Sequence, residues 1–190
     1  MSNVKKIQTP LNRETIADLH CGDKVLITGT IYTARDAAHK RMVEALDRGE
    51  DLPVDWRNQI VYYAGPTPAP PGRIIGSCGP TTSGRMDTFT PRMLELGLAG
   101  MIGKGPRSKE VIQAIVDAQA VYFAAVGGAA ALIASRIKDV SVVAYDDLGP
   151  EAIRRMVVED YPCIVAVDSK GQDLYELGPE KYRKTIETLS

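Results

Sequence analysis

Residues 77–87 read Ser-Cys-Gly-Pro-Thr-Thr-Ser-Gly-Arg-Met-Asp, and the predicted fold is organised around them. The Gly79-Pro80 pair ends an apolar run at residues 74–75, and three hydroxyl-bearing residues follow it. Such side chains cap helices by accepting hydrogen bonds from free backbone N–H groups. The stretch therefore predicts a strand, a tight turn and a helix that begins inside the motif. That helix start suits an anion, and Arg85 adds a forked donor for a carboxylate; the alternative is a capped helix that binds nothing.

The composition is that of an ordinary globular protein. The chain has 190 residues, of which 44% are hydrophobic and 25% charged, and its formal net charge is −1. This balance argues against broad binding to nucleic acid or to anionic membranes. No apolar run approaches the ~18 residues that a membrane-spanning helix needs, and the N-terminus lacks the apolar core of a signal peptide. We therefore expect a cytoplasmic protein with room for one sizeable core.

The three cysteines, Cys21, Cys78 and Cys163, are widely spaced. They form no CxxC motif or Cys/His cluster of the kind that holds zinc or an iron–sulfur cluster, so no metal site is expected within this chain. Cys21 and Cys163 are interpreted as reduced thiols in or near the core. Cys78 lies inside the 77–87 motif, and nothing in the sequence indicates that it is reactive.

Strands and helices alternate through the middle of the chain. Strands are predicted at residues 24–32, 59–64, 74–76, 99–102, 121–126, 140–145 and 164–168, the last forming a hairpin with residues 173–176. Helices are predicted at residues 36–48, 86–96, 109–118, 127–135 and 179–189, with a short one starting at residues 149–151. Residues 65–72 are proline-rich and predict a stiff, exposed loop. The pattern indicates an α/β protein with a mixed β-sheet, in which an N-terminal arm (residues 1–23) precedes a single domain (residues 24–190).

Three turns of the predicted sheet share one arrangement, because each follows a strand and carries a cation. These cations are Arg35, Arg85, and Lys104 with Arg107. In an open α/β sheet such turns gather at one edge, where ligands bind. Neighbouring glycines let a ligand approach the backbone closely. We interpret the turns as the walls of a pocket for a small di-anion; the alternative is a set of separate, solvated surface charges.

No residue of the sequence stands out as a catalytic base. His39 follows Arg35 on a predicted helix, where a structural or surface role is the simpler interpretation. Asp36 and Asp87 lie one or two residues from a candidate arginine, and we expect them to orient it rather than to move protons. Residues 103–105, Gly-Lys-Gly, lack the spacing of a nucleoside-triphosphate loop.

Taken together, three strings of the sequence resemble one known family. They are Gly-Pro-Thr-Thr-Ser-Gly-Arg-Met-Asp at 79–87, Thr-Ala-Arg-Asp-Ala-Ala-His-Lys-Arg at 33–41, and Gly-Lys-Gly-Pro-Arg-Ser at 103–108. They resemble the class I (iron–sulfur) fumarate hydratase and L-tartrate dehydratase family, in its C-terminal or beta-subunit portion. The likeness runs from residue 24 to residue 168. The chain has Ser83 where the family more often has alanine and Ala34 where it more often has glycine, and both changes are conservative.

This resemblance implies an activity, a cofactor and a partner. Family members hydrate fumarate to L-malate, a step of the tricarboxylic acid cycle, or dehydrate tartrate to oxaloacetate, with a [4Fe–4S] cluster. The cluster's cysteines lie in the other half of the enzyme, which in two-subunit members is a separate alpha subunit. We therefore expect a hydro-lyase beta subunit that is active only with its alpha subunit, in an α2β2 heteromer. The family's fold for this portion is a swivelling β/β/α domain.

The resemblance also implies roles for individual residues. Thr81 matches the proposed catalytic base, and Arg35, Arg85 and Lys104 match ligands of the substrate carboxylates. The residues expected to support them are Thr82, Asp87 and Arg107. Fumarate is the substrate that the close likeness of the strings favours. The alternatives are an L-tartrate dehydratase beta subunit and a carboxylate-binding or assembly module without catalytic activity.

Overall fold

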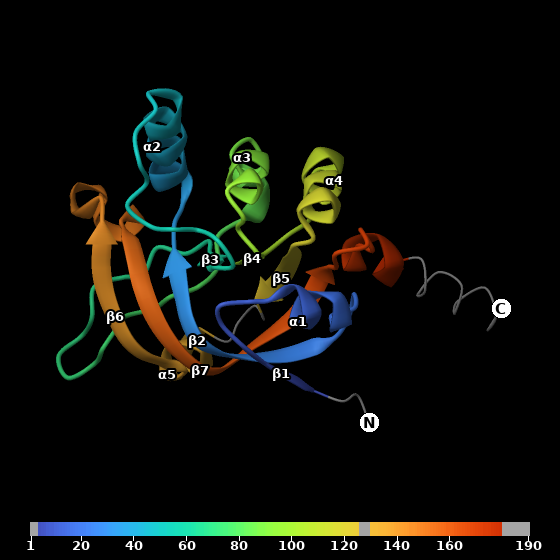
Figure 1. The fold of residues 1–190 in the computed structure, drawn as a ribbon. Helices are drawn as coiled ribbons and strands as arrows, with labels where there is room; N and C mark the ends of the chain where they lie inside the picture. Colours follow the sequence, from blue (N-terminus) through green and yellow to red (C-terminus); the bar gives the residue numbers. More distant parts are fainter. Residues whose placement is uncertain (1–3, 126–129, 180–190) are drawn as a thin grey trace.

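The computed structural model describes residues 4–125 and 130–179, and it confirms an α/β domain with a mixed sheet (Figure 1). The strands are β1 (Lys5–Gln8), β2 (Lys24–Thr33), β3 (Ile60–Tyr62), β4 (Gly100–Gly103), β5 (Val121–Ala125), β6 (Ile137–Ala144) and β7 (Ile153–Val167). The α-helices are α1 (Arg13–Asp18), α2 (Asp36–Asp47), α3 (Thr90–Glu95), α4 (Lys109–Ala118) and α5 (Ala130–Ser135). There are also two 3₁₀ helices, η1 (Ser83–Met86) and η2 (Asp146–Glu151).

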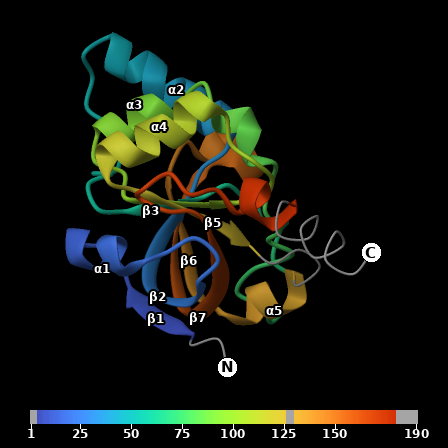
Figure 2. The ribbon, with the colours of Figure 1, turned by 90° about the vertical axis from the view of Figure 1, so that its right-hand side faces the viewer.

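The sheet has seven strands in the order β1-β2-β3-β4-β5-β7-β6. Strands β1 to β5 run parallel to their neighbours, and β7 is antiparallel to β5 and β6. The long strand β7 also pairs antiparallel with β2, so that β2, β3, β4, β5 and β7 close into a ring (Figure 2). The carboxyl ends of the parallel strands therefore meet at one edge of this ring, beside the starts of α2, α3 and α4 (Figure 1).

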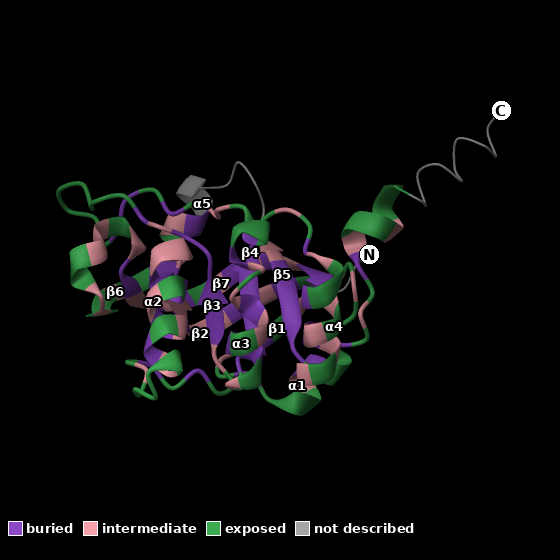
Figure 3. Cartoon of the chain, turned by 90° about the horizontal axis from the view of Figure 1, so that it is seen from above, coloured by how far each residue is buried: buried purple, intermediate pink, exposed green. Residues whose placement is uncertain are grey.

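Alternation along the strands divides the core into two layers. On β3, Ile60 and Tyr62 face the inside of the ring, whereas Val61 and the following Tyr63 pack under the helices. Burying one such aliphatic side chain contributes roughly 2 kcal/mol, so a slip of one residue in register would exchange the two layers and is strongly disfavoured. Helices α2, α3 and α4 cover the outer layer, with their own outer faces exposed (Figure 3).

The covering helices form where the sequence places apolar residues at helical spacing. Helix α2 buries Ala38, Met42 and Ala45 on one side, as the periodicity predicts. Helix α4 begins as expected at Ser108, whose side chain accepts a hydrogen bond from the backbone N–H of Val111. The predicted helices at residues 36–48 and 109–118 are therefore confirmed.

The 77–87 motif differs from its prediction. It contains only the 3₁₀ turn η1, and the α-helix expected at residues 86–96 begins later, at Thr90. Thr82, at the N-cap of η1, makes no side-chain cap bond. The helix start has Pro91 in the first turn, where its missing N–H costs nothing.

The strand predicted at residues 74–76 is wrong. This segment bends back along the proline-rich loop, since the backbone N–H of Thr67 donates to the carbonyl of Ser77 at 3.0 Å. Gly76 allows this close approach, because a Cβ there would lie 2.3 Å from the Thr67 hydroxyl oxygen. The prediction of an irregular loop at residues 65–72 is confirmed.

The hairpin predicted at the end of the chain is reduced to one antiparallel bridge, between Val167 and Asp173, closed by a turn in which the N–H of Gly171 donates to the carbonyl of Asp168 at 3.0 Å. Residues 153–167 form the single strand β7, and residues 174–179 are helical rather than extended. The reason is Asp173, whose carboxylate accepts the backbone N–H of Tyr175 at 2.9 Å and so starts a helical turn. The remainder of the helix predicted at residues 179–189 lies outside the described residues.

The N-terminal segment, predicted as an arm, contributes to the sheet. β1 pairs in parallel with β2, and the segment buries Leu11, Ile16 and Leu19 against the inside of the ring. The start of the helix predicted at residues 127–135 lies outside the described residues, and α5 occupies its end. Within the described part of the chain, no helix combines the length and the apolar character needed to cross a membrane.

Candidate active site

The structure brings the three cation-bearing turns together at the carboxyl ends of β2, β3 and β4. Arg35 is the N-cap residue of α2, two residues after β2 ends. Residues 80–83 lie between the ends of β3 and β4, and Lys104 directly follows β4. The sequence prediction that these turns share one edge therefore holds in the fold.

Backbone hydrogen bonds fix the threonine-rich part of the motif between two strand ends. The N–H of Thr81 donates to the carbonyl of Tyr63 at 2.8 Å, and the N–H of Ser83 donates to the carbonyl of Lys104 at 2.8 Å. These N–H groups are therefore engaged with the sheet, which explains why no capped α-helix begins here. Thr81 is half-buried, whereas Thr82 and Lys104 are exposed.

Four charged side chains form one connected network at this edge. Arg85 donates from Nε to Asp36 Oδ1 at 2.8 Å, and Arg35 Nη2 lies 3.3 Å from Glu151 Oε1. Asp36 Oδ2 lies 3.8 Å from Arg35 Nε, so the carboxylate sits between the two arginines. Asp36 therefore orients an arginine, as expected, but its hydrogen-bonded partner is Arg85 of the second turn rather than its neighbour in the sequence.

The edge retains donors for an anionic ligand. Arg85 uses Nε for Asp36, and its two Nη groups make no hydrogen bond to the described residues, so they can form the forked pair that suits a carboxylate. The ammonium of Lys104 forms no ion pair with any residue that the structure describes. Three cations thus face two carboxylates, Asp36 and Glu151, which leaves an excess of positive charge at the edge.

Beneath the edge lies a buried ion pair. The side chain of Arg107 is fully buried, and its Nε donates to Asp87 Oδ1 at 2.7 Å. Its Nη2 donates to the Thr90 hydroxyl at 2.7 Å, and its guanidinium lies over the rings of Tyr63 and Tyr122. Any contribution of Arg107 to the site is therefore a supporting one, since its donors are used inside the protein.

A second buried contact joins the motif to the lysine-bearing turn. The Tyr122 hydroxyl donates to the carbonyl of Gly105 at 2.8 Å, so the Ser83 hydroxyl, 2.8 Å away, must donate to Tyr122. Burial raises the pKa of Tyr122 above its usual value, which keeps this hydroxyl protonated. A Cβ at Gly103 would lie 1.9 Å from the Ser83 oxygen, so only glycine fits there.

His39 and Cys78 have structural settings rather than reactive ones. Burial lowers the pKa of His39 to about 4, so the ring is neutral at pH 7 and donates from Nδ1 to the carbonyl of Arg35 at 2.8 Å. This agrees with a structural interpretation of the histidine. Burial raises the pKa of Cys78 to about 12, which makes its thiol unreactive at neutral pH.

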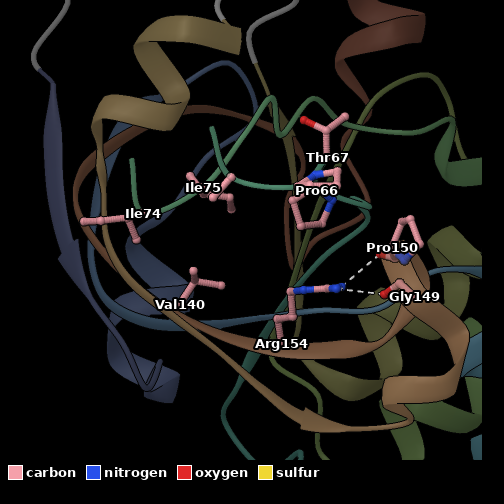
Figure 4. Close-up of a pocket in the computed structure, with 10 residues that line it drawn as sticks. Pro66, Thr67, Ile74, Ile75, Val140, Gly149, Pro150 and Arg154 are labelled. Atoms are coloured by element: carbon pink, nitrogen blue, oxygen red, sulfur yellow. Dashed lines mark hydrogen bonds between the residues drawn. The ribbon is translucent and has the colours of Figure 1, made fainter. Parts of the chain in front are cut away.

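An apolar pocket of about 360 Å³ lies next to the charged edge (Figure 4). Pro66, Ile74, Ile75 and Val140 supply apolar walls, and Arg154 is the cation that lines it. The guanidinium of Arg154 donates to backbone carbonyls of η2, so it is not presented to an anion. This pocket therefore differs in chemistry from the charged edge.

Comparison with known proteins identifies a family for the chain. A model of the family described as "Fumarase C-terminus" matches residues 2–178. The chain belongs to the Fumarase C-terminus family. A relative from Methanocaldococcus jannaschii, named "Putative L(+)-tartrate dehydratase subunit beta", is 39% identical over 186 residues, which cover 95% of this chain and 94% of that protein.

Other relatives are longer than this Fumarase C-terminus chain. "Fumarate hydratase 2" of Leishmania major is 39% identical over 165 residues, which cover 86% of this chain and 29% of that protein. "Fumarate hydratase class I, anaerobic" of Escherichia coli is 39% identical over 178 residues, which cover 90% of this chain and 32% of that protein. The chain therefore spans about a third of the length of these two fumarate hydratases.

Sequence reasoning missed one member of the charged network, Glu151. The Gly-Pro-Glu string at residues 149–151 predicts a short helix start, and η2 ends there. Nothing in that string indicates a partner on α2. The signal in the sequence lies at Arg35, the partner of Glu151. Arg35 falls at the N-cap of a predicted helix, and its side chain has no atom that could accept a hydrogen bond from the free N–H groups there.

Proposed function

We propose that this chain is the beta subunit of a two-subunit, Fe–S-dependent hydro-lyase that interconverts fumarate and L-malate. The observation that carries the proposal is the meeting of Arg35, Arg85 and Lys104 around Thr81 at one edge of the sheet. The names of the fumarate hydratase relatives support the reaction class. The name "subunit beta" of a relative matched over nearly its whole length supports a separate alpha partner. An α2β2 assembly and a cytoplasmic location are part of the same proposal.

Substrate binding follows from the donors at the edge. Fumarate and L-malate carry two carboxylates, so two separate groups of cations are required. The two Nη groups of Arg85 suit one carboxylate in a forked pair, and Arg35 adds charge beside it. Lys104, on the far side of the threonine-rich segment, is placed to balance the second carboxylate. Cations bound to both ends of the substrate orient it along the edge.

Thr81 belongs to the segment between the ends of β3 and β4 and is the proposed base. In the dehydration direction its oxygen removes a proton from the malate carbon adjacent to a carboxylate, and the hydroxyl on the neighbouring carbon leaves. A threonine hydroxyl is a weak base in water, so nearby cations are needed to favour its alkoxide. Arg85 and Lys104 supply that positive charge. They also stabilise the negative charge that builds up on the substrate carboxylate as the proton leaves.

The residues of this chain do not fit a [4Fe–4S] cluster. A cluster needs thiolate ligands, whereas burial raises the pKa of Cys78 to about 12 and also raises that of Cys163. Among the described residues no group of three or more His, Cys, Asp or Glu side chains is arranged to hold a metal. In the proposal the cluster is held by the alpha subunit, and the residues of this chain bind the substrate and move the proton.

The direct test is to reconstitute the chain with its alpha partner under anaerobic conditions. The reaction is then measured as the change in the absorbance of fumarate with time. Thr81→Ala should lower kcat by about 100-fold or more, the range expected for loss of a general base, while KM changes little. Thr81→Ser keeps the hydroxyl and is the matched control, with most of the activity retained. An unchanged kcat in Thr81→Ala would remove Thr81 from this role, and an inactive wild-type pair would reject the hydratase assignment.

L-Tartrate dehydration is the second candidate. It is favoured by one specific observation, the near full-length match to a relative named as a tartrate dehydratase subunit beta. The same reconstituted pair distinguishes the two when kcat/KM is measured with L-malate and with L-tartrate. A pair that binds a dicarboxylate but converts neither substrate would instead support a carboxylate-binding or assembly module.

A further inference from the structure

The start of α2 takes its capping group from another part of the chain. Arg35 occupies the N-cap position, where helices favour a side chain that accepts a hydrogen bond, and its guanidinium has only donors. Glu151 supplies the acceptor. Its Oε2 accepts a hydrogen bond of 2.9 Å from the backbone N–H of Ala37, a residue 114 positions away in the sequence. A carboxylate at this place also suits the partial positive charge of a helix N-terminus.

The same carboxylate holds the Arg35 side chain with its second oxygen. Oε1 of Glu151 lies 3.3 Å from Arg35 Nη2, and both side chains are largely buried. The Nε of Arg35 is buried and has no hydrogen-bond partner among the described residues. The guanidinium packs against Gly65, where an added Cβ would lie 3.1 Å from Nη1. Asp36 Oδ2 lies farther from the guanidinium, at 3.8 Å from Nε, so Glu151 is the nearer of its two anionic partners and the one that holds its Nη end.

Glu151 is itself held by a fixed turn. Gly149 adopts φ 57° and ψ −117°, a conformation that strongly favours glycine, and this kink places Glu151 against α2. Arg154, from β7, donates from Nη2 to the Gly149 carbonyl at 2.7 Å and from Nη1 to the Pro150 carbonyl at 3.0 Å (Figure 4). The carboxylate therefore sits on a turn that the sheet secures.

We propose that Glu151 is a positioning residue for Arg35. One carboxylate oxygen caps α2, and the other holds the guanidinium in the direction in which it receives a substrate carboxylate. The inference rests on the proposed function, in which Arg35 binds a dicarboxylate. The arginine side chain is already ordered before the substrate arrives. Substrate binding therefore does not have to compensate for the conformational entropy that a flexible side chain would lose. This gain outweighs the repulsion between Glu151 and the di-anion.

Two substitutions separate the capping role from the positioning role. In Glu151→Gln the amide oxygen still accepts the Ala37 N–H, but the amide N–H₂ then faces the Arg35 guanidinium, donor against donor. This variant should keep the thermal stability of the wild type and bind dicarboxylate about tenfold more weakly, because the ion pair that holds the Arg35 guanidinium is replaced by a contact between two donors. Glu151→Ala removes both contacts and should lose both stability and affinity.

Asp147→Asn is the matched control. Asp147 lies on the same 3₁₀ helix and also contacts α2, through paired hydrogen bonds to Arg41 at 2.8 Å each, but it touches no residue of the proposed site. If Glu151 acts by positioning Arg35, Asp147→Asn should leave dicarboxylate affinity unchanged. If it raised KM as much as Glu151→Gln does, general loosening of η2 would explain the effect and the proposal would be overturned.

The measurements are the Kd of L-malate and the KM and kcat for fumarate, made on the same alpha–beta assemblies. The expected result for Glu151→Gln is a rise in both Kd and KM with kcat within about twofold of the wild type. Wild-type or tighter affinity in Glu151→Gln would overturn the proposal, because repulsion would then dominate. A wild-type assembly that binds L-malate without turning over fumarate or tartrate rejects the proposed function, while the Kd comparison still decides the role of Glu151. A wild-type assembly that binds no dicarboxylate overturns both.

Discussion

Two layers of polar residues lie at the carboxyl ends of the parallel strands, and they contain the same kinds of ion pair in different surroundings. The polar layer nearer the solvent is called the rim. It consists of Arg35, Asp36, Arg85, Lys104 and Glu151. The buried layer beneath it consists of Ser83, Asp87, Thr90, Arg107 and Tyr122. Both contain an Arg–Asp hydrogen bond of nearly equal length, 2.8 Å for Arg85–Asp36 and 2.7 Å for Arg107–Asp87.

The two Arg–Asp pairs differ in their exposure to water. The side chain of Arg85 is 54% exposed, whereas that of Arg107 is 0% exposed. An exposed ion pair contributes little to the free energy of unfolding, because water screens both charges. Removing one partner of a buried pair is costly, since the other charge is left without compensation. The comparison teaches that the buried layer stabilises the edge and the rim is available to a ligand.

The largest expected effect comes from breaking the buried layer. Arg107→Met keeps most of the side-chain volume, but it leaves Asp87 without its charged partner and removes the 2.7 Å hydrogen bond that Thr90 accepts from Arg107. We expect the free energy of unfolding to fall by about 3 kcal/mol, measured by denaturant titration.

Arg92→Met is the control for that substitution. Arg92 pairs with Glu95 at 2.7 Å on the surface of α3, with both side chains at least half exposed. This variant should leave the denaturation midpoint nearly unchanged. Equal destabilisation by Arg92→Met and Arg107→Met would contradict the distinction between the two layers.

A smaller effect is expected from the pH dependence of His39, which lies beside the buried layer. In the unfolded chain a histidine binds a proton below its ordinary pKa of 6.5, whereas burial holds the pKa of folded His39 at about 4. Between these values the unfolded state binds more protons, so stability falls as the pH drops from 6.5 toward 4. We expect a loss of about 2 kcal/mol between pH 7 and pH 5 from this residue.

The measurement is the free energy of unfolding at several pH values. His39→Asn should flatten the dependence between pH 5 and pH 7, even if the variant is less stable at every pH. His20, whose side chain is half exposed, offers the control, because His20→Asn should leave the dependence in place. A slope that His39→Asn does not alter would show that other groups cause it.

Much of the edge was predictable from local sequence. The apolar, β-branched and aromatic residues at 59–64 predict β3, and the cations after three strands predict that Arg35, Arg85 and Lys104 lie together. These predictions succeed because strand propensity and turn positions depend on neighbouring residues. The same reasoning gave the confirmed N-cap at Ser108.

The predictions that failed involve partners far apart in the chain. The 77–87 motif predicts a helix start with free N–H groups for a cap or an anion, but the N–H of Thr81 donates to the carbonyl of Tyr63. Asp36 binds Arg85 across 49 positions rather than its neighbour, and Glu151 was not predicted as a partner at all. Such pairings depend on which turns the closed ring of strands brings together. Local sequence patterns do not predict which distant turns become neighbours.

The smallest expected change in stability, and the sharpest test of the comparison, comes from the rim. Arg85→Lys keeps the positive charge but replaces a planar fork with a single ammonium group, so the forked pair with a carboxylate is lost. Because Arg85 is exposed, the denaturation midpoint should stay close to that of the wild type. Binding of L-malate to the assembled pair should weaken about tenfold, the cost of one charged hydrogen bond. Calorimetric titration and denaturation of the same samples measure both quantities. Destabilisation of Arg85→Lys comparable to that of Arg107→Met would place Arg85 with the buried layer, and unchanged affinity for L-malate would remove it from the dicarboxylate site.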